Sequence, residues 1–78
     1  MAKKVNKRIK HAPHRKLKAF FVEHGIKQRE VADLLGISIV TLNHKLNGYL
    51  HFTFNEVEQI CDEYGIKPDI FFTKEVAR

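Results

Sequence analysis

Residues 28–47 constrain the fold of this chain more than any other segment. Val31 and Leu35 fall at helical spacing in its first half, which predicts an amphipathic helix. Gly36 follows, and a glycine can take the positive φ at which a helix ends. Ser38 is a good N-cap for a second helix. The segment therefore predicts two short helices joined by a tight turn.

The second of these helices has two distinct sides. With about 100° between successive residues, positions 39–47 divide into a side that can pack and an opposite side that stays accessible. The packing side carries Thr41, Leu42, Lys45 and Leu46, and the opposite side carries Val40, Asn43, His44 and Asn47, with Ile39 at the border. We expect the opposite side to be free to bind a partner.

Three further helices are predicted around this pair. Pro13 precedes a helix over about residues 14–24. Residues 53–56 form a capping box, which begins a helix that ends near Gly65, and Pro68 suits the first turn of a short fifth helix. We expect an all-α, compact five-helix domain over residues 14–73, preceded by a flexible arm at 1–13 and followed by a tail at 74–78.

The length and cysteine content favour a small domain of the cytoplasm. At 78 residues, roughly 60% of the surface of the unfolded chain can be buried, so the core must be compact. Cys61 is the only cysteine, which rules out an intrachain disulfide and makes a reducing compartment the expected location. No apolar run approaches the roughly 18 residues of a membrane helix, and no signal-peptide pattern follows the basic N-terminus.

The charge is distributed very unevenly along the chain. Eight of the fourteen Lys and Arg residues lie in the first eighteen positions, and no acidic residue precedes Glu23. From residue 19 onward six basic residues face nine acidic ones, so this part has a net charge of −3. A polyanion would therefore be attracted mainly to the arm. The alternative is that the arm is a solvated tail that only increases solubility.

Taken together, these residues resemble the phage repressor/Cro-like, or XRE-type, family of helix-turn-helix DNA-binding domains. The resemblance covers about residues 14–72, and the segment from Lys45 to Glu56 is also similar to small phage and mobile-element regulators. The matching residues are Gln28, Val31, Ala32, Leu35, Gly36, Ile37, Ser38, Thr41, Leu42, Asn47 and Gly48, followed by Tyr64, Gly65 and Ile66. The resemblance implies five helices, with the third in the major groove of DNA.

The resemblance also implies which residues read bases. The base-facing positions are Ile39, Val40, Asn43 and His44. Asn43 can pair with adenine N6 and N7, the two aliphatic side chains can pack on a thymine methyl group, and His44 can donate to guanine or to a phosphate. We expect a half-site rich in A·T pairs.

Further residues are expected to contact the sugar-phosphate backbone. Side chains and backbone N–H groups near the ends of the two helices can position the protein on phosphates. The expected positions are Lys27, Gln28, Thr41, Lys45, Asn47 and Tyr49, and the expected arm contacts are Lys3, Lys4, Lys7, Arg8 and Lys10.

Two departures from the family pattern affect this interpretation. Lys45 stands where the family usually has an aliphatic residue, and Leu46 stands where it usually has a polar one. Lys45 is expected to extend along its aliphatic stem to a phosphate. Ile39 and Val40 stand where polar side chains are more usual, so this end of the helix could contact thymine methyl groups or another protein.

No enzymatic or metal site is predicted. His11 and His14 are three residues apart, but no cysteine or acidic residue near them completes a zinc site. Cys61 shares a helix face with Val57 and Tyr64, which predicts a buried structural thiol. We expect no cofactor, because no Gly-rich phosphate loop and no catalytic set of side chains is recognisable.

The sequence thus predicts a sequence-specific transcriptional regulator, a repressor or Cro-like protein of bacterial or phage origin. Two copies on a pseudo-palindromic operator are expected, because one short domain buries little surface on DNA. Residues 70–72 either close the core or form a dimer contact, and Tyr49 with Leu50 is the other candidate contact. The alternatives are a protein-interaction module, antirepressor-like or antitoxin-like, and a nucleoid-type protein that binds DNA through the arm alone.

Overall fold

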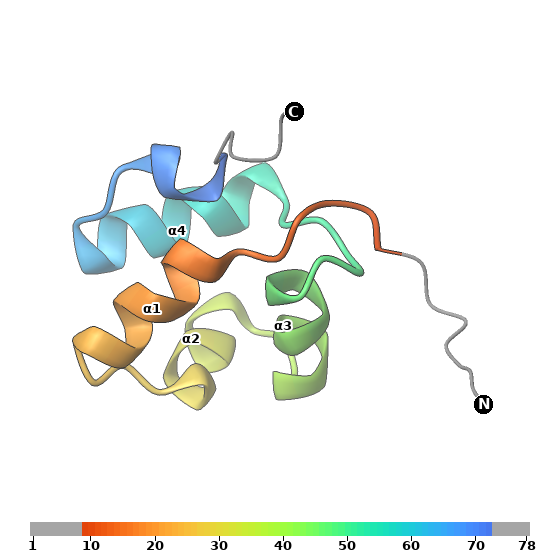
Figure 1. Cartoon of the computed structure of the whole chain (residues 1–78). Helices are drawn as coiled ribbons and strands as arrows, with labels where there is room; N and C mark the ends of the chain where they lie inside the picture. Colours follow the sequence, from red (N-terminus) through yellow and green to blue (C-terminus); the bar gives the residue numbers. More distant parts are fainter. Residues whose placement is uncertain (1–8, 73–78) are drawn as a thin grey trace.

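The computed structural model of the chain describes residues 9–72, and these contain helices but no strands (Figure 1). The described residues form four α-helices and one 3-10 helix. They are α1 (Arg15–Glu23), α2 (Gln28–Leu35), α3 (Ile39–Leu46), α4 (Phe54–Tyr64) and η2 (Pro68–Phe71). The all-α prediction is confirmed, but the predicted fifth helix is a single 3-10 turn.

The two helices predicted in residues 28–47 are α2 and α3. The end of α2 and the start of α3 fall where their local signals predict. Gly36 adopts a left-handed conformation with φ 71° and ends α2. The side chain of Ser38 then accepts a hydrogen bond of 3.0 Å from the backbone N–H of Thr41, which is the N-cap bond of α3. Three residues therefore separate the two helices, and α2 packs directly against α3.

The capping box of α4 is also present as predicted. The hydroxyl of Thr53 accepts a hydrogen bond from the N–H of Glu56 at 3.1 Å. The carboxylate of Glu56 accepts one from the N–H of Thr53 at 2.9 Å. Two N–H groups that a helix start would leave unpaired are thus satisfied.

The 3-10 geometry of η2 follows from its length. Its hydrogen bonds join residues three apart: the N–H of Ile70 donates to Lys67 at 3.2 Å, and the N–H of Phe72 donates to Asp69 at 3.0 Å. Such turns are common in short segments. The turn buries Phe71 in the core but leaves Phe72 66% exposed. Closure of the core by residues 70–72 is therefore confirmed for Phe71 and is wrong for Phe72.

The core is small and draws on every element of the described chain. Its fully packed members are aliphatic or aromatic side chains that lie together between the helices. They are Leu17 and Phe21 from α1, Val31 and Ala32 from α2, Leu42 and Leu46 from α3, Ile60 from α4, and Phe71 from η2. None of the helices within residues 9–72 is long and apolar enough to span a membrane.

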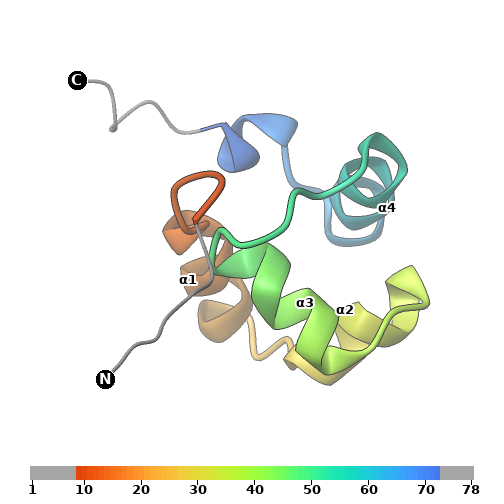
Figure 2. The ribbon, with the colours of Figure 1, turned by 90° about the vertical axis from the view of Figure 1, so that its right-hand side faces the viewer.

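The chain ahead of α1 is packed against the C-terminal end of α3. The N–H groups of Lys10 and His11 donate to the carbonyl oxygen of Gly48 at 2.6 and 3.2 Å, and the N–H of His14 donates to Leu46 at 2.8 Å. Figure 2 shows this segment lying over that end of α3. The packed domain therefore begins before residue 14, where the sequence placed its boundary, and residues 1–8 of the predicted arm lie outside the described residues.

Candidate nucleic-acid interface

The outer side of α3 is accessible, and its inner side is buried. Leu42 and Leu46 have no exposed surface, whereas Val40 is 64% exposed and Ile39 is 36% exposed. Asn43 is half-buried, and within residues 9–72 its amide makes no hydrogen bond to the protein. The division of the helix that the 100° rotation predicted is therefore present in the fold, and α3 runs across the front of the molecule in Figure 2.

The C-terminal end of α3 continues into a loop, and His44 of the helix forms an aromatic pair with Tyr49 of the loop. The carbonyl oxygen of His44 accepts hydrogen bonds from the N–H groups of Tyr49 and Leu50 at 2.8 and 3.2 Å. The rings of His44 and Tyr49 stand edge to face, with 6.0 Å between their centroids. His44, a predicted base-reading residue, therefore lies beside Tyr49, a predicted phosphate-contacting residue.

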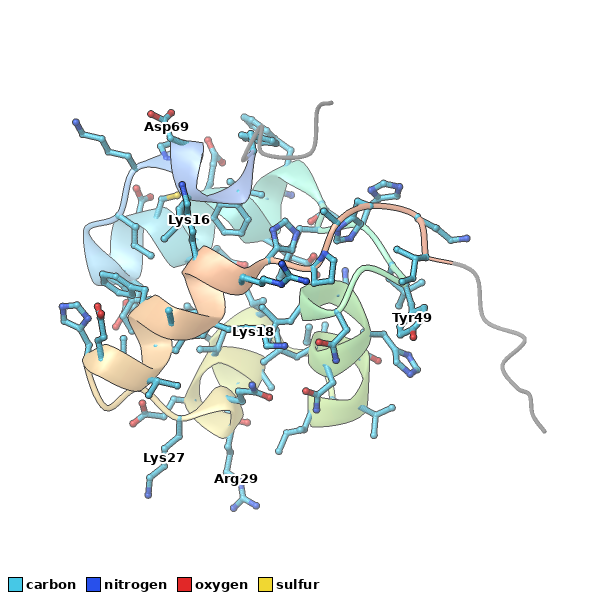
Figure 3. The ribbon with its side chains drawn as sticks, viewed as in Figure 1. Lys16, Lys18, Lys27, Arg29, Tyr49 and Asp69 are labelled. Carbon is cyan, nitrogen blue, oxygen red and sulfur yellow. The ribbon has the colours of Figure 1, made fainter. Side chains whose placement is uncertain are left out.

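The N-terminal end of α2 supplies polar and basic side chains. Gln28 is half-buried at the first position of α2, and Lys27 and Arg29 beside it are exposed. Figure 3 shows both basic side chains extending away from the domain at this end. Arg29 was not among the contacts predicted from the sequence, although a basic residue in the first turn of a helix is unfavourable for the helix dipole and could have singled it out as a candidate.

Thr41 belongs to the N-terminal cap of α3 and is half-buried. Its hydroxyl oxygen accepts a hydrogen bond of 3.0 Å from the hydroxyl of Ser38. The O–H of Thr41 is still able to donate to an acceptor, because a hydroxyl is both donor and acceptor.

Lys45 does not reach the surface, so the expectation that it extends to a phosphate is wrong. It is only 8% exposed, and its ammonium nitrogen lies 2.6 Å from the carboxylate of Glu56. The ammonium also lies 5.9 Å from the centroid of the Phe52 ring. Lys45 shares the inner side of α3 with Leu42 and Leu46, so its stem is directed toward α4, where the carboxylate balances the buried charge.

A second lysine has a partner that the sequence did not reveal. Lys18 of α1 donates a hydrogen bond from its ammonium to the side-chain oxygen of Asn47 at 2.8 Å. Figure 3 shows Lys18 extending from α1 toward α3. Because Lys18 occupies the oxygen of the amide, the NH₂ group of Asn47 is the part that can donate to a phosphate. The two residues are far apart in the sequence, so no local pattern indicates the pair.

Three histidines gather at the junction of residues 11–14 with the loop before α4. The ring centroids of His11 and His14 are 4.7 Å apart, and those of His11 and His51 are 5.0 Å apart. Burial, together with the positive charges that His11 and His51 can carry, lowers the pKa of His14 to about 4. Within residues 9–72, no three His, Cys, Asp or Glu side chains are placed to hold a metal ion.

Cys61 lies on the inner side of α4, where it is partly buried and packs against the core. Burial, and to a smaller extent the carboxylate of Asp62, raises the pKa of its thiol. A raised pKa disfavours the thiolate, which is the reactive form. A structural thiol, partly rather than fully buried, agrees with this environment.

The helix-turn-helix family model matches residues 17–71, from the first core residue of α1 to the last residue of η2. The chain belongs to the XRE/Cro-type helix-turn-helix family. In the terms of this family α2, the turn at residues 36–38 and α3 form the helix-turn-helix, and α3 is the recognition helix. Membership indicates DNA as the partner, and such domains are generally not enzymes. A search of curated proteins found no significant match.

Proposed function

We propose that this XRE/Cro-type chain is a sequence-specific transcriptional regulator, a repressor or Cro-like protein of bacterial or phage origin, that places α3 in the major groove. The observation that carries the proposal is the two-sided structure of α3. Its inner side is fixed in the core by Leu42 and Leu46, while Val40 and Ile39 are exposed at its N-terminal end. In helix-turn-helix proteins this end of the recognition helix contacts base edges.

Four residues of α3 are proposed to read bases. Asn43 donates to and accepts from adenine, and Ile39 and Val40 pack against thymine methyl groups. His44, beside Tyr49, contacts a guanine acceptor or a phosphate. An A·T-rich half-site follows from this set.

The proposed phosphate contacts lie at the two ends of the helix-turn-helix. The contacts at the start of α2 are made by Lys27, Gln28 and Arg29, and the contact near the start of α3 is made by Thr41. Asn47 and Tyr49 contact phosphates just beyond the end of α3. Lys45 is not included, because its ammonium is paired with Glu56.

The arm is proposed to add contacts that depend on salt more than on sequence. Lys10 is exposed and lies where the packed segment meets the end of α3. Lys3, Lys4, Lys7 and Arg8 precede it, outside the described residues. Each phosphate that these residues neutralise releases counterions, so affinity falls as the salt concentration rises.

Selection from random duplexes, followed by footprinting, tests the proposal. We expect a selected site on which Asn43→Ala weakens binding by about 1–3 kcal/mol, with little change on unrelated DNA. Removal of residues 1–8 should instead weaken binding to both DNAs and flatten the salt dependence. If only the truncation matters and all duplexes bind equally, the chain is an arm-dependent nucleoid-type protein.

The same experiment addresses the protein-interaction alternative. Ile39 and Val40 form an exposed aliphatic pair, a feature that protein interfaces share. A chain that binds no duplex at low salt would contradict the regulator and leave an antirepressor-like or antitoxin-like role for this face.

A further inference from the structure

Residues 9–12, which we call the N-terminal segment, are attached to the turn that follows α3. The N–H groups of Lys10 and His11 donate to the carbonyl oxygen of Gly48 at 2.6 and 3.2 Å. Gly48 is buried, and a Cβ atom on it would lie 3.1 Å from Cγ2 of Ile9. This attachment fixes the position at which the basic arm joins the domain.

The half-buried ring of His11 faces two carbonyl oxygens. Its Nε2 lies 2.6 Å from the carbonyl oxygen of Leu50, and its Nδ1 lies 2.9 Å from that of Ala12. A carbonyl oxygen only accepts hydrogen bonds, and a neutral imidazole has one N–H, whereas an imidazolium has two. A neutral ring leaves one nitrogen lone pair against an oxygen. The protonated ring donates to both oxygens and thus holds the segment more firmly on the turn after α3.

Several ionisable groups surround His11. The rings of His14 and His51 contact it, with centroids 4.7 and 5.0 Å away. Burial, and then the charges of His11 and His51, lowers the pKa of His14 to about 4, so His14 is neutral between pH 6 and 8. His51 is exposed, and when charged it repels a charged His11. The other ionisable residues of the turn, of the segment and of the groove that His11 lines are Lys10, His44, Tyr49, Glu58, Asp62 and Lys67.

The attached segment lies beside the proposed phosphate contacts at the end of α3 (Figure 2). Gly48 stands between Asn47 and Tyr49 in the chain, and Lys10 is exposed where it bonds Gly48. Four further basic residues precede the segment at positions 3, 4, 7 and 8. A segment that is held in place before DNA arrives lowers the entropy that these side chains lose when they bind the duplex.

We propose that His11 is a positioning residue for the basic arm: its protonated ring holds residues 9–12 against the turn after α3, so that a lower pH strengthens the contribution of the arm to DNA binding. The consequence for DNA rests on the proposed function, whereas the attachment itself can be measured without DNA. Histidine is suited to this role, because its charge changes between about pH 5 and 8.

Hydrogen exchange of the full chain without DNA tests the attachment. In the wild type, the protection factors of the amides at positions 10 and 11 should be at least about threefold higher at pH 6 than at pH 8. His11→Gln should abolish this difference. His51→Gln is the matched control, because it removes an exposed imidazole of the same cluster but no bond to Leu50, and it should retain the difference. Equal protection at the two pH values in the wild type, or variants that behave alike, overturns the proposal.

Binding of the full chain to a selected duplex tests the consequence for DNA. Lys3, Lys4, Lys7 and Arg8 are replaced by Gln in the wild-type background and in the His11→Gln background. The loss of affinity should be at least about twofold larger at pH 6 than at pH 8 in the wild-type background, and equal at both pH values in the other. Comparison within one background cancels the charge that the other histidines gain at pH 6. An equal loss at both pH values in the wild-type background overturns the role of His11.

Failure of this inference is distinguishable from failure of the DNA-binding function. A chain whose amides show the expected pH dependence but which binds no duplex contradicts the proposed function and not the attachment. A chain that binds a selected site, but whose amides at positions 10 and 11 are equally protected at pH 6 and pH 8, contradicts only the role of His11.

Discussion

Lys45 and Lys18 lie on neighbouring helices, and each is held by a partner from another element. Lys45 is buried beside Glu56, which also caps α4, so one carboxylate joins the recognition helix to the helix that follows it. Lys18 remains near the surface and bonds the amide of Asn47. The first lysine fixes the position of α3, and the second orients a side chain at its C-terminal end.

Replacing Lys18 tests this orienting role. Lys18→Met should weaken DNA binding about fivefold, because the Asn47 amide loses the bond that directs its NH₂ group outward. Lys16→Met is the control, since Lys16 is exposed on α1 and Figure 3 shows it on the side facing η2. Both variants lose one charge, so fluorescence anisotropy over a range of salt concentrations should show similar salt slopes. An equal loss of affinity in the two variants would mean that only the net charge matters.

At the scale of elements, α3 is held on three sides. Its apolar residues pack in the core, Lys45 joins it to α4, and residues 10–14 hydrogen-bond to the backbone at its C-terminal end. Gly48 makes the last contact possible, since it has φ 96° and a Cβ atom there would overlap the carbonyl oxygen of His11. The ring of His11 adds a contact of 2.6 Å between its Nε2 and the carbonyl oxygen of Leu50.

Substitution of Gly48 should loosen this attachment. Gly48→Ala is expected to lower the free energy of unfolding by about 3 kcal/mol, because it combines an unfavourable φ with a steric overlap. Gly25→Ala should cost only about 1 kcal/mol, since Gly25 also has a positive φ but faces open space. Urea denaturation gives both values. Faster amide exchange at Lys10 and His11 in Gly48→Ala would identify the segment that moves, and equal costs at the two glycines would contradict the attachment.

At the scale of the whole molecule, the charge changes sign along the chain: residues 1–18 carry eight basic and no acidic residues, and residues 19–78 have a net charge of −3. The cluster of His11, His14 and His51 lies where the segment ahead of α1 meets the loop before α4. His14 contacts the rings of Phe52 and Phe71 as well as His11, so its charge state affects both the junction and the core.

His14 should make the fold sensitive to acid. Its pKa is about 4 in the folded chain and 6.5 in the unfolded chain, so the unfolded chain binds the extra proton first as the pH falls. The contribution of His14 to the free energy of unfolding is fully present above pH 6.5. It decreases as the pH falls below 6.5, and it is lost as the pH falls through about 4. The loss is at most about 3 kcal/mol, and less because the ring keeps some contact with solvent.

Comparison with a variant isolates this contribution from that of the carboxylates. His14→Phe retains an aromatic ring and should lose less stability than the wild type between pH 6.5 and 4, as measured by thermal unfolding. His24→Phe is the control, because His24 is exposed on the opposite end of α1. Parallel pH profiles for the wild type and His14→Phe would show that His14 does not titrate in this range.

The sequence by itself determined the elements whose signals are local. Each of these signals acts within a few residues of the helix it limits. The end of α2 could therefore be predicted from Gly36, the start of α3 from Ser38, and the start of α4 from the capping box of Thr53 and Glu56. The rotation of α3 was also predictable, because burial follows helical periodicity. The base-reading residues stay a prediction from that periodicity and from the family.

Only the tertiary structure decided what the charged and terminal residues do. Three pairs of residues are in contact although they are far apart in the sequence. They are Lys45 and Glu56, separated by 11 positions, Lys18 and Asn47, separated by 29, and His11 and Leu50, separated by 39. Such pairs arise when packing brings separate elements together, and periodicity along one helix carries no information about them. The same packing buries Phe71 and leaves Phe72 66% exposed. Local hydrogen bonding thus defined the helix-turn-helix, and long-range packing decided which side chains remain for its partners.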